Sequence, residues 1–330
     1  MKIALDVNGS DEAPASELAG ARRALEERDA LDLILVGDPA SVEPILSEWP
    51  DSLLDRVELE PATDRIHPGE SPASAVRKRP DSSIVRGIRL QKEGRADAFI
   101  SAGSTGAVMA ASLIFLRPLP GVARPAIGTV LPTAKGPTLM LDAGANVDCK
   151  PMHLLQFARL GAIYAQDLMG VPEPRVALLN IGEEPEKGDE LSVEAHMLLR
   201  ESNLNFVGNL EGRDVIQGAC DVLVCDGFVG NVLLKFYESV AEFVIGLLGR
   251  ELDLQGVDLD LHKVFRALDY AEYGGAPLLG VNGVTIICHG KSPPKAIRNA
   301  IRVAVQAVES RMIAHIAGEL GQSEANSADP

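Results

Sequence analysis

Apolar and polar positions form alternating blocks along the chain, and these blocks predict strands and helices in turn. Helical patterns lie between the strand candidates, for example over 14–28 and 105–116. A continuous apolar run that ends at glycine and polar residues is typical of a strand buried on both faces of a parallel sheet. Such runs are KIALDV (2–7), DLILVG (32–37), DAFISAG (97–103), AIGTVL (126–131), PTLMLDAG (137–144), RVALLNIG (175–182), CDVLVCDG (220–227) and VTIICHG (284–290).

This alternation predicts an α/β protein with a Rossmann-like, mostly parallel sheet and helices on both faces. No composition break marks a linker and no internal repeat is visible, so residues 1–330 are expected to form one domain. The segment 231–271 has no strand candidate and predicts a protruding helical hairpin, with helices over 232–252 and near 258–271. The polar end, 321–330, is expected to be a disordered tail.

Charge and composition exclude several classes of protein. The chain carries 31 Lys and Arg against 47 Asp and Glu, and aromatic residues make up 4% of it. This balance argues against a nucleic-acid backbone as the main partner and against base-stacking platforms. The first residues reach Asp6 without an apolar core, so no secretory signal is expected. Four cysteines without CxxC or zinc-like spacing favour a reduced, cytosolic protein without a metal site.

The ends of the strand candidates carry the candidate chemistry, because ligands of open parallel sheets bind outside the carboxyl ends of the strands. SAGSTGA, which opens the helix predicted from Thr105, is a plausible cradle for phosphate or carboxylate, although a tight turn alone is the alternative. Six strand ends place glycine beside Asp, Asn, Ser, Thr or Lys, at 6–11, 102–106, 142–150, 183–190, 226–231 and 289–292.

Familiar catalytic motifs are absent. GxGxxG, HExxH and GxSxG do not occur, and Thr285 stands where a P-loop needs its first glycine. Cys225 is interpreted as a buried thiol, and His153 and His196 as structural residues. Lys187 lies in an acidic loop between a strand and a helix, where it is either a surface lysine or a functional one. Asp142 and Asp226 end strands and have the alternative of capping backbone N–H groups.

Long stretches of the chain, in order, resemble the family of bacterial acyl-ACP:phosphate acyltransferases, from Asp6 to about residue 308. The resemblance implies that acyl-[acyl carrier protein] and inorganic phosphate react to give acyl-phosphate and free carrier protein, an early step of glycerophospholipid synthesis, without a cofactor. The sequence departs from the family pattern at Asn8, Ser10, Ser104, Asp189 and Lys291. The matching stretches are SAGSTGA, LDAGANVDCKP, QFARLGAIYA, PRVALLNIGEEPEKGDEL, NFVGNLEGRD, DVLVCDGFVGN, and GGAPLLGVNG with the following HG.

The resemblance also implies site residues. Lys187 is expected to stabilise phosphate or the developing oxyanion, and Asn231 is the candidate amide donor. His289 is a weaker candidate for contact with the leaving thiolate or an anion. Phosphate is already an anionic nucleophile, so no Ser–His–Asp triad is needed. Further contacts to phosphate or substrate are expected from Gly9, Asp11, Gly103, Ser104, Thr105, Gly106, Asn146 and Asp226.

Two surfaces are expected to bind partners. The carrier protein is acidic like this chain, so a local basic cluster must attract it, unless that cluster is an ordinary solvated helix face. The resemblance further implies a cytoplasmic homodimer, peripherally bound to the inner face of the membrane near a membrane glycerol-phosphate acyltransferase, with the hairpin facing membrane or dimer partner. The basic cluster is Arg77, Lys78, Arg79, Arg86 and Arg89; the membrane candidates are Leu233, Leu234, Phe243, Leu247 and Leu248.

Other functions remain open from the residues alone. A phosphate acetyltransferase-like enzyme would use acyl-CoA, and an isopropylmalate dehydrogenase-like enzyme would use NAD. A non-catalytic membrane scaffold that binds acyl carrier protein is the alternative outside enzymes. Assays of acyl-CoA and NAD turnover separate these classes.

Overall fold

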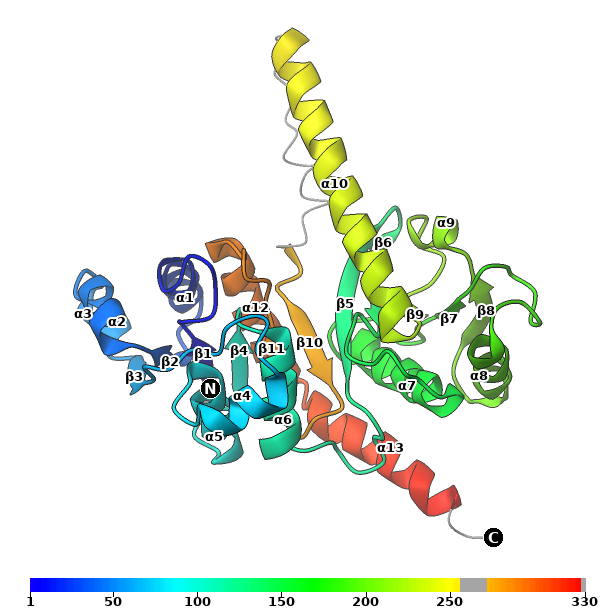
Figure 1. The fold of residues 1–330 in the computed structure, drawn as a ribbon, viewed down its shortest axis with the longest axis horizontal. Coiled ribbons are helices and arrows are strands. Elements are labelled where there is room, and N and C mark those ends of the chain that lie inside the picture. The colour runs from blue at the N-terminus through cyan, green and yellow to red at the C-terminus, as the bar shows by residue number, and fades with distance from the viewer. Residues whose placement is uncertain (256–271, 328–330) are drawn as a thin grey trace. The chain divides into compact units, whose positions relative to one another are not determined.

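The computed structural model describes residues 1–255 and 272–327, and the chain divides into two compact units (Figure 1). Unit 1 consists of Met1–Pro125, Asp167–Gly170 and Tyr273–Pro330, and unit 2 of Ala126–Gln166 and Val171–Glu272. The expectation of one domain over 1–330 stays a prediction, and each unit is described by itself.

Unit 1 contains a sheet whose strands are parallel except for one pair. Its strand order is β3-β2-β1-β4-β11-β10, and only β10 and β11 pair antiparallel. Every residue of β4 and all but the first of β1 are buried, as the apolar runs predicted. The strands are β1 (Lys2–Asp6), β2 (Asp32–Gly37), β3 (Val57–Pro61), β4 (Ala98–Ser101), β10 (Ala276–Leu279) and β11 (Val284–Ile287).

Two groups of helices cover the sheet of unit 1. One group pairs α1 with α12, and the other packs α4 and α5 on α6, while α12 and α5 each contact both β1 and β4. Because these strands are buried on both faces, the two groups cover opposite faces. The helices are α1 (Ala15–Glu27), α2 (Pro39–Leu46), α3 (Asp51–Leu54), α4 (Pro72–Lys78), α5 (Ser83–Lys92), α6 (Thr105–Phe115), α12 (Pro294–Glu309) and α13 (Met312–Ser327).

Unit 2 repeats this arrangement with the strand order β5-β6-β9-β7-β8, in which only β5 and β6 pair antiparallel. The predicted α/β class with a large, mostly parallel sheet is therefore confirmed. The elements are β5 (Ala126–Thr133), β6 (Gly136–Leu141), α7 (Pro151–Asp167), β7 (Val176–Leu179), α8 (Glu190–Glu201), β8 (Phe206–Leu210), α9 (Gly212–Val215), β9 (Val222–Val224) and α10 (Gly227–Gln255).

The long helix α10 corresponds to the first helix of the predicted hairpin, whereas the second, near 258–271, lies outside the described residues. With 29 residues, α10 extends past the sheet of its own unit (Figure 1), since a helix of this length spans about 44 Å. Among the described residues, no helix combines the length and the apolar character needed to cross a bilayer. At the other end, α13 runs to Ser327, so it includes most of the expected disordered tail, 321–330.

Three strands, β3, β8 and β10, were not predicted from the sequence. The strands β3 and β8 end the strand orders of their units, and their side chains are mostly half-exposed. β10 is a four-residue strand that contains Pro277. Such strands lack the continuous apolar run of a central strand.

Candidate active site

The N-terminus of α6 offers backbone donors at the carboxyl edge of the unit 1 sheet. Ser104 is its N-cap, and the Ser104 hydroxyl accepts a hydrogen bond from Ala107 N at 3.4 Å. The amides of Thr105 and Gly106 have no acceptor among the described residues. Open amides and the positive end of the helix dipole favour an anion at such a position. Ser104, Thr105 and Gly106 thus form a neutral helix N-terminus with open amides, and phosphate binding there stays a prediction.

The turn after β1 lies directly against the turn after β4. A Cβ atom built on Gly9 would lie 2.7 Å from Gly103 N, so the two backbones touch. The buried carboxylate of Asp6 connects the same turns, because it accepts from Asn8 N at 2.9 Å and from the Ser101 hydroxyl at 2.6 Å. Ser101 in turn accepts from Gly103 N at 3.0 Å. Burial raises the pKa of Asp6, and these hydrogen bonds oppose the rise.

Asp11 and His289 come together at this edge through the backbone. Asp11 N donates to Gly290 O at 2.8 Å, which joins the β1 turn to the turn after β11. His289 is exposed, and its Nδ1 accepts from Lys291 N at 3.2 Å, so the opposite ring nitrogen points away from that bond. Unit 1 therefore gathers Gly9, Asp11, Gly103 and His289 at one edge, as the strand-end argument predicted.

In unit 2, the turn after β6 is closed around Asp142. This buried carboxylate accepts five hydrogen bonds, from the amides of Ile127, Gly144, Ala145 and Asn146 and from Asn146 Nδ2. Burial raises the pKa of Asp142, and the N–H donors oppose that rise. Asn146 is buried and gives its Nδ2 to Asp142 at 2.9 Å. The geometry gives Asn146 a structural contact, and its substrate contact stays a prediction.

The N-terminus of α10 is also closed. The carboxylate of Asp226 accepts from Phe228 N at 2.8 Å and from Val229 N at 3.0 Å. Gly227 N donates to Asn146 O at 2.7 Å. Asp226 thus caps the backbone N–H groups of α10, which is one of the two roles considered for it from the sequence. Its negative charge disfavours phosphate at this helix terminus.

Asn231 follows one turn later and has an accessible amide. Its side chain is exposed and lies against Gly144, since a Cβ atom on Gly144 would come within 3.4 Å of Asn231 Cγ. No described residue hydrogen-bonds to this side chain. Asn231 is therefore placed at the carboxyl edge of β6 and β9 with an exposed amide, and its role as amide donor stays a prediction.

Lys187 lies in the loop after β7, the strand that pairs with β9 in parallel, so its loop leaves the same edge of the sheet as Asn231. The Lys187 side chain is exposed and forms no ion pair among the described residues, although several acidic residues surround it in sequence. The predicted pair of Lys187 and Asn231 thus shares one edge of unit 2, but the structure gives no contact between their side chains.

The backbone of the Lys187 loop is fixed by residues that the sequence analysis did not assign to the site. Asn180 Nδ2 donates to Lys187 O at 2.8 Å, and Asn209 Nδ2 donates to Glu184 O at 2.8 Å. The buried ring of His196 contacts Asn209 Oδ1 at 2.9 Å, which supports its interpretation as a structural residue. The signal available for Asn180 was its place at the end of a core strand, directly before the acidic loop that contains Lys187.

Three of the four cysteines are buried and poorly suited to act as nucleophiles. Cys225 is buried, and burial raises the pKa of its thiol well above the ordinary value. Burial likewise raises the pKa of Cys220 and Cys288 to about 12. A thiol must ionise to attack a thioester, so these groups do not form an acyl-enzyme near neutral pH. Within the described part of the chain, no cluster of His, Cys, Asp or Glu has the geometry of a metal site.

The predicted basic cluster on α4 and α5 divides into paired and free cations. Arg79 pairs with Glu70 at 3.3 Å, Arg86 pairs with both Glu60 and Asp81, and Arg89 stacks on Phe115 at 4.9 Å. In contrast, Arg77 and Lys78 are exposed at the end of α4 and have no ion-pair partner among the described residues.

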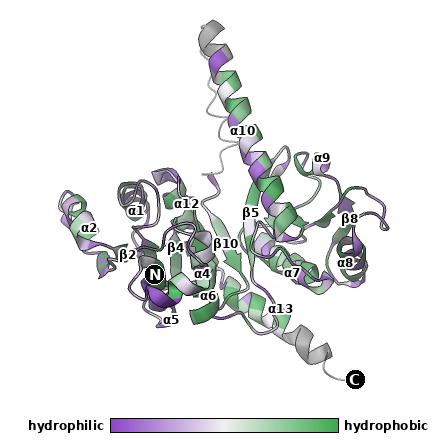
Figure 2. Ribbon diagram, in the orientation of Figure 1, coloured by the Kyte–Doolittle hydropathy of each residue, from purple (hydrophilic) through white to green (hydrophobic). Residues whose placement is uncertain are grey.

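One face of α10 carries a stripe of exposed apolar side chains, spaced three or four residues apart. Figure 2 shows that hydrophobic and hydrophilic residues both occur along this helix. Of the predicted membrane residues, Phe243 and Leu247 belong to this stripe, while Leu233, Leu234 and Leu248 are half-buried. We call this set the apolar stripe of α10, and its members are Val229, Val232, Phe236, Val240, Phe243 and Leu247.

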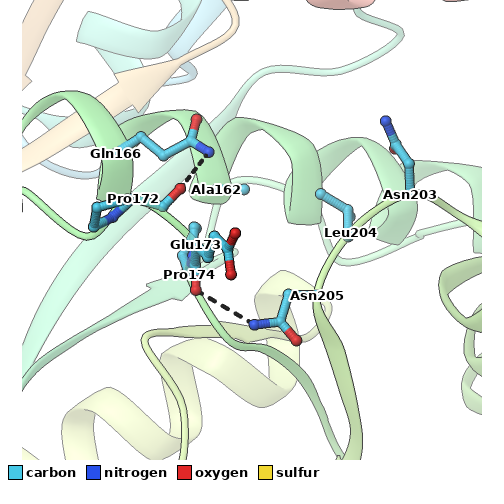
Figure 3. A pocket seen from close by; sticks show the side chains of 8 residues that line it. All are labelled: Ala162, Gln166, Pro172, Glu173, Pro174, Asn203, Leu204 and Asn205. Carbon is cyan, nitrogen blue, oxygen red and sulfur yellow. Dashed lines mark hydrogen bonds between the residues drawn. The ribbon is translucent and has the colours of Figure 1, made fainter.

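A separate hollow of about 300 Å³ lies in unit 2 before the amino ends of β7 and β8 (Figure 3). Two side-chain amides along it already donate to backbone carbonyls, Gln166 to Pro172 O at 3.1 Å and Asn205 to Glu173 O at 3.3 Å. Because it lies at the opposite edge from Lys187 and Asn231, it is not the site predicted from the strand ends. Its lining residues are Ala162, Gln166, Pro172, Glu173, Pro174, Asn203, Leu204 and Asn205.

Known structures place this fold in a recognised class. A phosphotransacetylase from Streptococcus pyogenes aligns with 94% of this chain and 94% of its own, at 19% identity and a TM-score of 0.64. The EutD phosphotransacetylase from Staphylococcus aureus gives the same coverage and identity at a TM-score of 0.61. At these identities the likeness defines the fold alone, an α/β fold that phosphotransacetylases share.

Sequence comparison then defines the family. Residues 1–315 match the profile described as "Fatty acid synthesis protein". The phosphate acyltransferase of Heliobacterium modesticaldum is 52% identical over 97% of this chain and 99% of its own length. That of Desulforamulus reducens is 49% identical over 95% of each chain. The chain belongs to this fatty acid synthesis protein family of phosphate acyltransferases, and it is an acyltransferase.

Proposed function

We propose that the chain transfers the acyl group of acyl-[acyl carrier protein] to inorganic phosphate. The products are acyl-phosphate, an activated acyl donor for lipid synthesis, and free carrier protein. The observation that carries this proposal is the Lys187 loop, whose backbone is fixed by Asn180 and Asn209 while its ammonium group is exposed and unpaired. The family relationship over nearly the full length of the chain supports the same reaction.

In the proposed reaction, a phosphate oxygen attacks the thioester carbonyl carbon to give a tetrahedral intermediate. The carbon–sulfur bond then breaks, the carbonyl re-forms, and the thiolate of the carrier protein leaves and takes a proton. Lys187 supplies positive charge and Asn231 an N–H donor to the developing oxygen charge. Phosphate is itself the nucleophile because it is anionic, and burial raises the pKa of the thiols of Cys220, Cys225 and Cys288, which makes them poor competitors.

The N-terminus of α6 is assigned to phosphate. Its amides at Thr105 and Gly106 lack acceptors among the described residues, and the capping residue, Ser104, is neutral. The N-terminus of α10 is not assigned to phosphate, because the Asp226 carboxylate already occupies its amides. A neutral cap with open amides is the condition that a helix terminus needs to bind an anion.

The carrier-protein surface is assigned to the unpaired cations of the basic cluster. Arg77 and Lys78 form no ion pair among the described residues. In contrast, Arg79 and Arg86 each form ion pairs with acidic side chains. The start of α4 packs on the start of α6, since a Cβ atom on Gly106 would lie 2.8 Å from Pro72 Cγ. An acidic protein held at α4 therefore docks beside the turn assigned to phosphate.

The apolar stripe of α10 is assigned to the membrane surface, to which the chain attaches peripherally as a homodimer. Exposed side chains such as Phe236 and Phe243, at 68% and 69% exposure, are unfavourable in water. A helix with such a stripe binds at the level of the lipid headgroups.

The reaction is tested with purified protein, palmitoyl-[acyl carrier protein] and inorganic phosphate, with the acyl-phosphate trapped by hydroxylamine. We expect product that depends on phosphate and on the carrier protein. Turnover of palmitoyl-CoA at a higher kcat/KM would favour the phosphate acetyltransferase-like alternative. Binding of carrier protein without any product would favour the scaffold alternative.

Membrane attachment is tested with Phe243→Glu and Leu247→Glu together, against the half-buried control Leu233→Ala. We expect the double variant to stay off anionic vesicles in flotation while its mass in light scattering equals that of the wild type. A fall to half the mass with flotation retained would instead place the stripe in the dimer interface.

A further inference from the structure

Arg65, between β3 and α4, holds the turn after β1 and was not assigned a role by the sequence. Its side chain is half-exposed, and Nη2 donates to Gly9 O at 3.0 Å and to Ser10 O at 2.9 Å. Neither Nη1 nor Nε has an acceptor among the described residues. A guanidinium carries five N–H donors in one plane, so the backbone of the turn uses only one side of the group. Donors therefore remain for a further oxygen acceptor.

The position of Arg65 joins it to the open amides of α6. The backbone of Gly9, which Arg65 contacts, touches that of Gly103, and Gly103 immediately precedes the α6 cap Ser104. The positive charge of Arg65 also acts on Asp6, where it opposes the rise in pKa that burial causes. A cation with spare donors and a helix terminus with spare amides thus lie on contacting turns of one sheet edge. This combination suits a tetrahedral oxyanion with several oxygens.

Glu17 in α1 fixes the same turn from the protein interior. Its fully buried carboxyl group accepts from Ser10 N at 2.9 Å through Oε1, while Oε2 is buried without a partner. A buried carboxylate with one unpaired oxygen is unfavourable for stability, and leucine has a similar volume. Stability therefore does not explain the presence of a glutamate at position 17. The hydrogen bond from Ser10 N to Glu17 does, because the carbonyl of Ser10 accepts from Arg65.

We propose that Arg65 is a substrate-binding residue that contacts an oxygen of the phosphate, and that Glu17 positions it by fixing Ser10. The identity of the anion rests on the proposed function, whereas the binding site itself does not. Two of the positions at which the chain departs from the pattern of the family it resembles, Asn8 and Ser10, belong to this turn. Arg65 thus places a side-chain cation beside the open backbone amides of α6.

The test measures binding of inorganic phosphate to the intact chain by calorimetry, together with KM values in the acyl-transfer assay. For Arg65→Met we expect the Kd and KM for phosphate to rise at least about 10-fold, the loss of a charge-assisted hydrogen bond. The KM for acyl-[acyl carrier protein] should not change. Arg65→Lys should give a smaller rise, about 3-fold, because it keeps the charge but loses the planar fork.

A matched control is available in Arg56. This arginine also donates to backbone carbonyls, those of Leu25, Arg28 and Asp29, but it precedes β3 at the opposite edge of the sheet. Arg56→Met removes the same kind of contact and should leave the Kd for phosphate unchanged. An equal rise in Kd for both methionine variants would mean that lost backbone support, not anion contact, weakens binding, and would overturn the proposal.

Variants of Glu17 test the positioning role. Glu17→Gln keeps an oxygen acceptor for Ser10 N and should keep the wild-type Kd for phosphate. Glu17→Leu removes the acceptor and should raise that Kd about 3-fold or more, while its resistance to urea is at least that of the wild type. Weaker binding by a more stable protein excludes misfolding as the cause.

The outcomes separate this inference from the proposed function. Wild-type affinity for phosphate in Arg65→Met would overturn the role of Arg65 even if acyl transfer proceeds. If Arg65→Met does not fold, the two single variants Arg65→Lys and Glu17→Leu decide the question. Wild-type affinity for phosphate in both would overturn the role of Arg65. Phosphate binding that is lost in Arg65→Met, in a chain without acyl transfer, would sustain the site and reject the reaction.

Discussion

The N-termini of α6 and α10 both follow glycine-containing turns, but their capping residues differ in charge. Both follow core strands through glycine turns, SAGSTGA before α6 and DGFVGN before α10. In α6 the neutral Ser104 hydroxyl takes one amide, whereas in α10 the Asp226 carboxylate takes two. Only the first terminus is therefore open to an anion. Glycine content predicts a tight turn, but the capping side chain decides whether phosphate is admitted.

Two buried carboxyl groups, that of Asp142 in unit 2 and that of Glu17 in unit 1, differ in how many hydrogen bonds they accept. Asp142 in unit 2 accepts five hydrogen bonds within its own turn and from Ile127. Glu17 in unit 1 accepts one from Ser10 and leaves Oε2 unpaired. The carboxyl group of Asp142 is thus satisfied by surrounding N–H donors, whereas that of Glu17 keeps one buried oxygen without a partner.

The largest change in the free energy of unfolding is expected for substitution of Asp142. Asp142→Ala leaves several buried amides without an acceptor, and we expect a loss of about 4 kcal/mol in the free energy of unfolding. Asp142→Asn, which keeps one acceptor oxygen, should lose less. Urea denaturation measures both, and a loss below about 1 kcal/mol for the alanine variant would break the contrast with Glu17.

The contribution of Glu17 to stability should depend on pH. Burial raises the pKa of Glu17 from 4.5 to about 7, so the folded state holds the proton more tightly than the unfolded state. The resulting stabilisation is full below pH 4.5 and disappears as the pH rises through about 7. From pH 4.5 to 8 the wild type should lose about 3 kcal/mol more than Glu17→Gln, which has no ionisable group there.

Urea denaturation of the two proteins at several pH values checks this dependence. Parallel stability curves for the wild type and Glu17→Gln would show that Glu17 ionises normally.

Ser104→Asp converts the cap of α6 into the type found in α10. Aspartate is as good an N-cap as serine, so the fold should be unaffected. The added charge beside the open amides should raise the KM for phosphate about 10-fold. Steady-state kinetics with varied phosphate measure this, and Ser104→Asn is the neutral control. An unchanged KM would place phosphate away from α6.

The smallest expected effect concerns the carrier protein. Arg77→Glu with Lys78→Glu should raise the KM for acyl-[acyl carrier protein] several-fold, about 5-fold at low salt, and less as salt increases. Arg79→Glu reverses a charge already paired with Glu70 and serves as the comparison. A larger effect from Arg79 than from the Arg77 and Lys78 pair would contradict the division of the cluster into paired and free cations.

The sequence predicted the central strands and the clustering of strand-end turns, because continuous apolar runs and glycine turns are local signals. It missed β3 and β8, whose half-exposed side chains lack such runs. It could not reveal Arg65, whose contacts to Gly9 and Ser10 join segments more than fifty residues apart. It also could not assign Asp226 to a cap rather than a ligand, since both roles use the same residue at the same place.

The central claim, that Lys187 stabilises the transition state of acyl transfer to phosphate, is tested most directly by the kcat of Lys187→Ala. Lys235→Ala, which removes a surface lysine paired with Glu238, is the matched control. The account predicts that kcat falls about 10²-fold or more in Lys187→Ala, as for other lost oxyanion donors, with an unchanged melting curve. A kcat within about 3-fold of the wild type in the folded variant would contradict it.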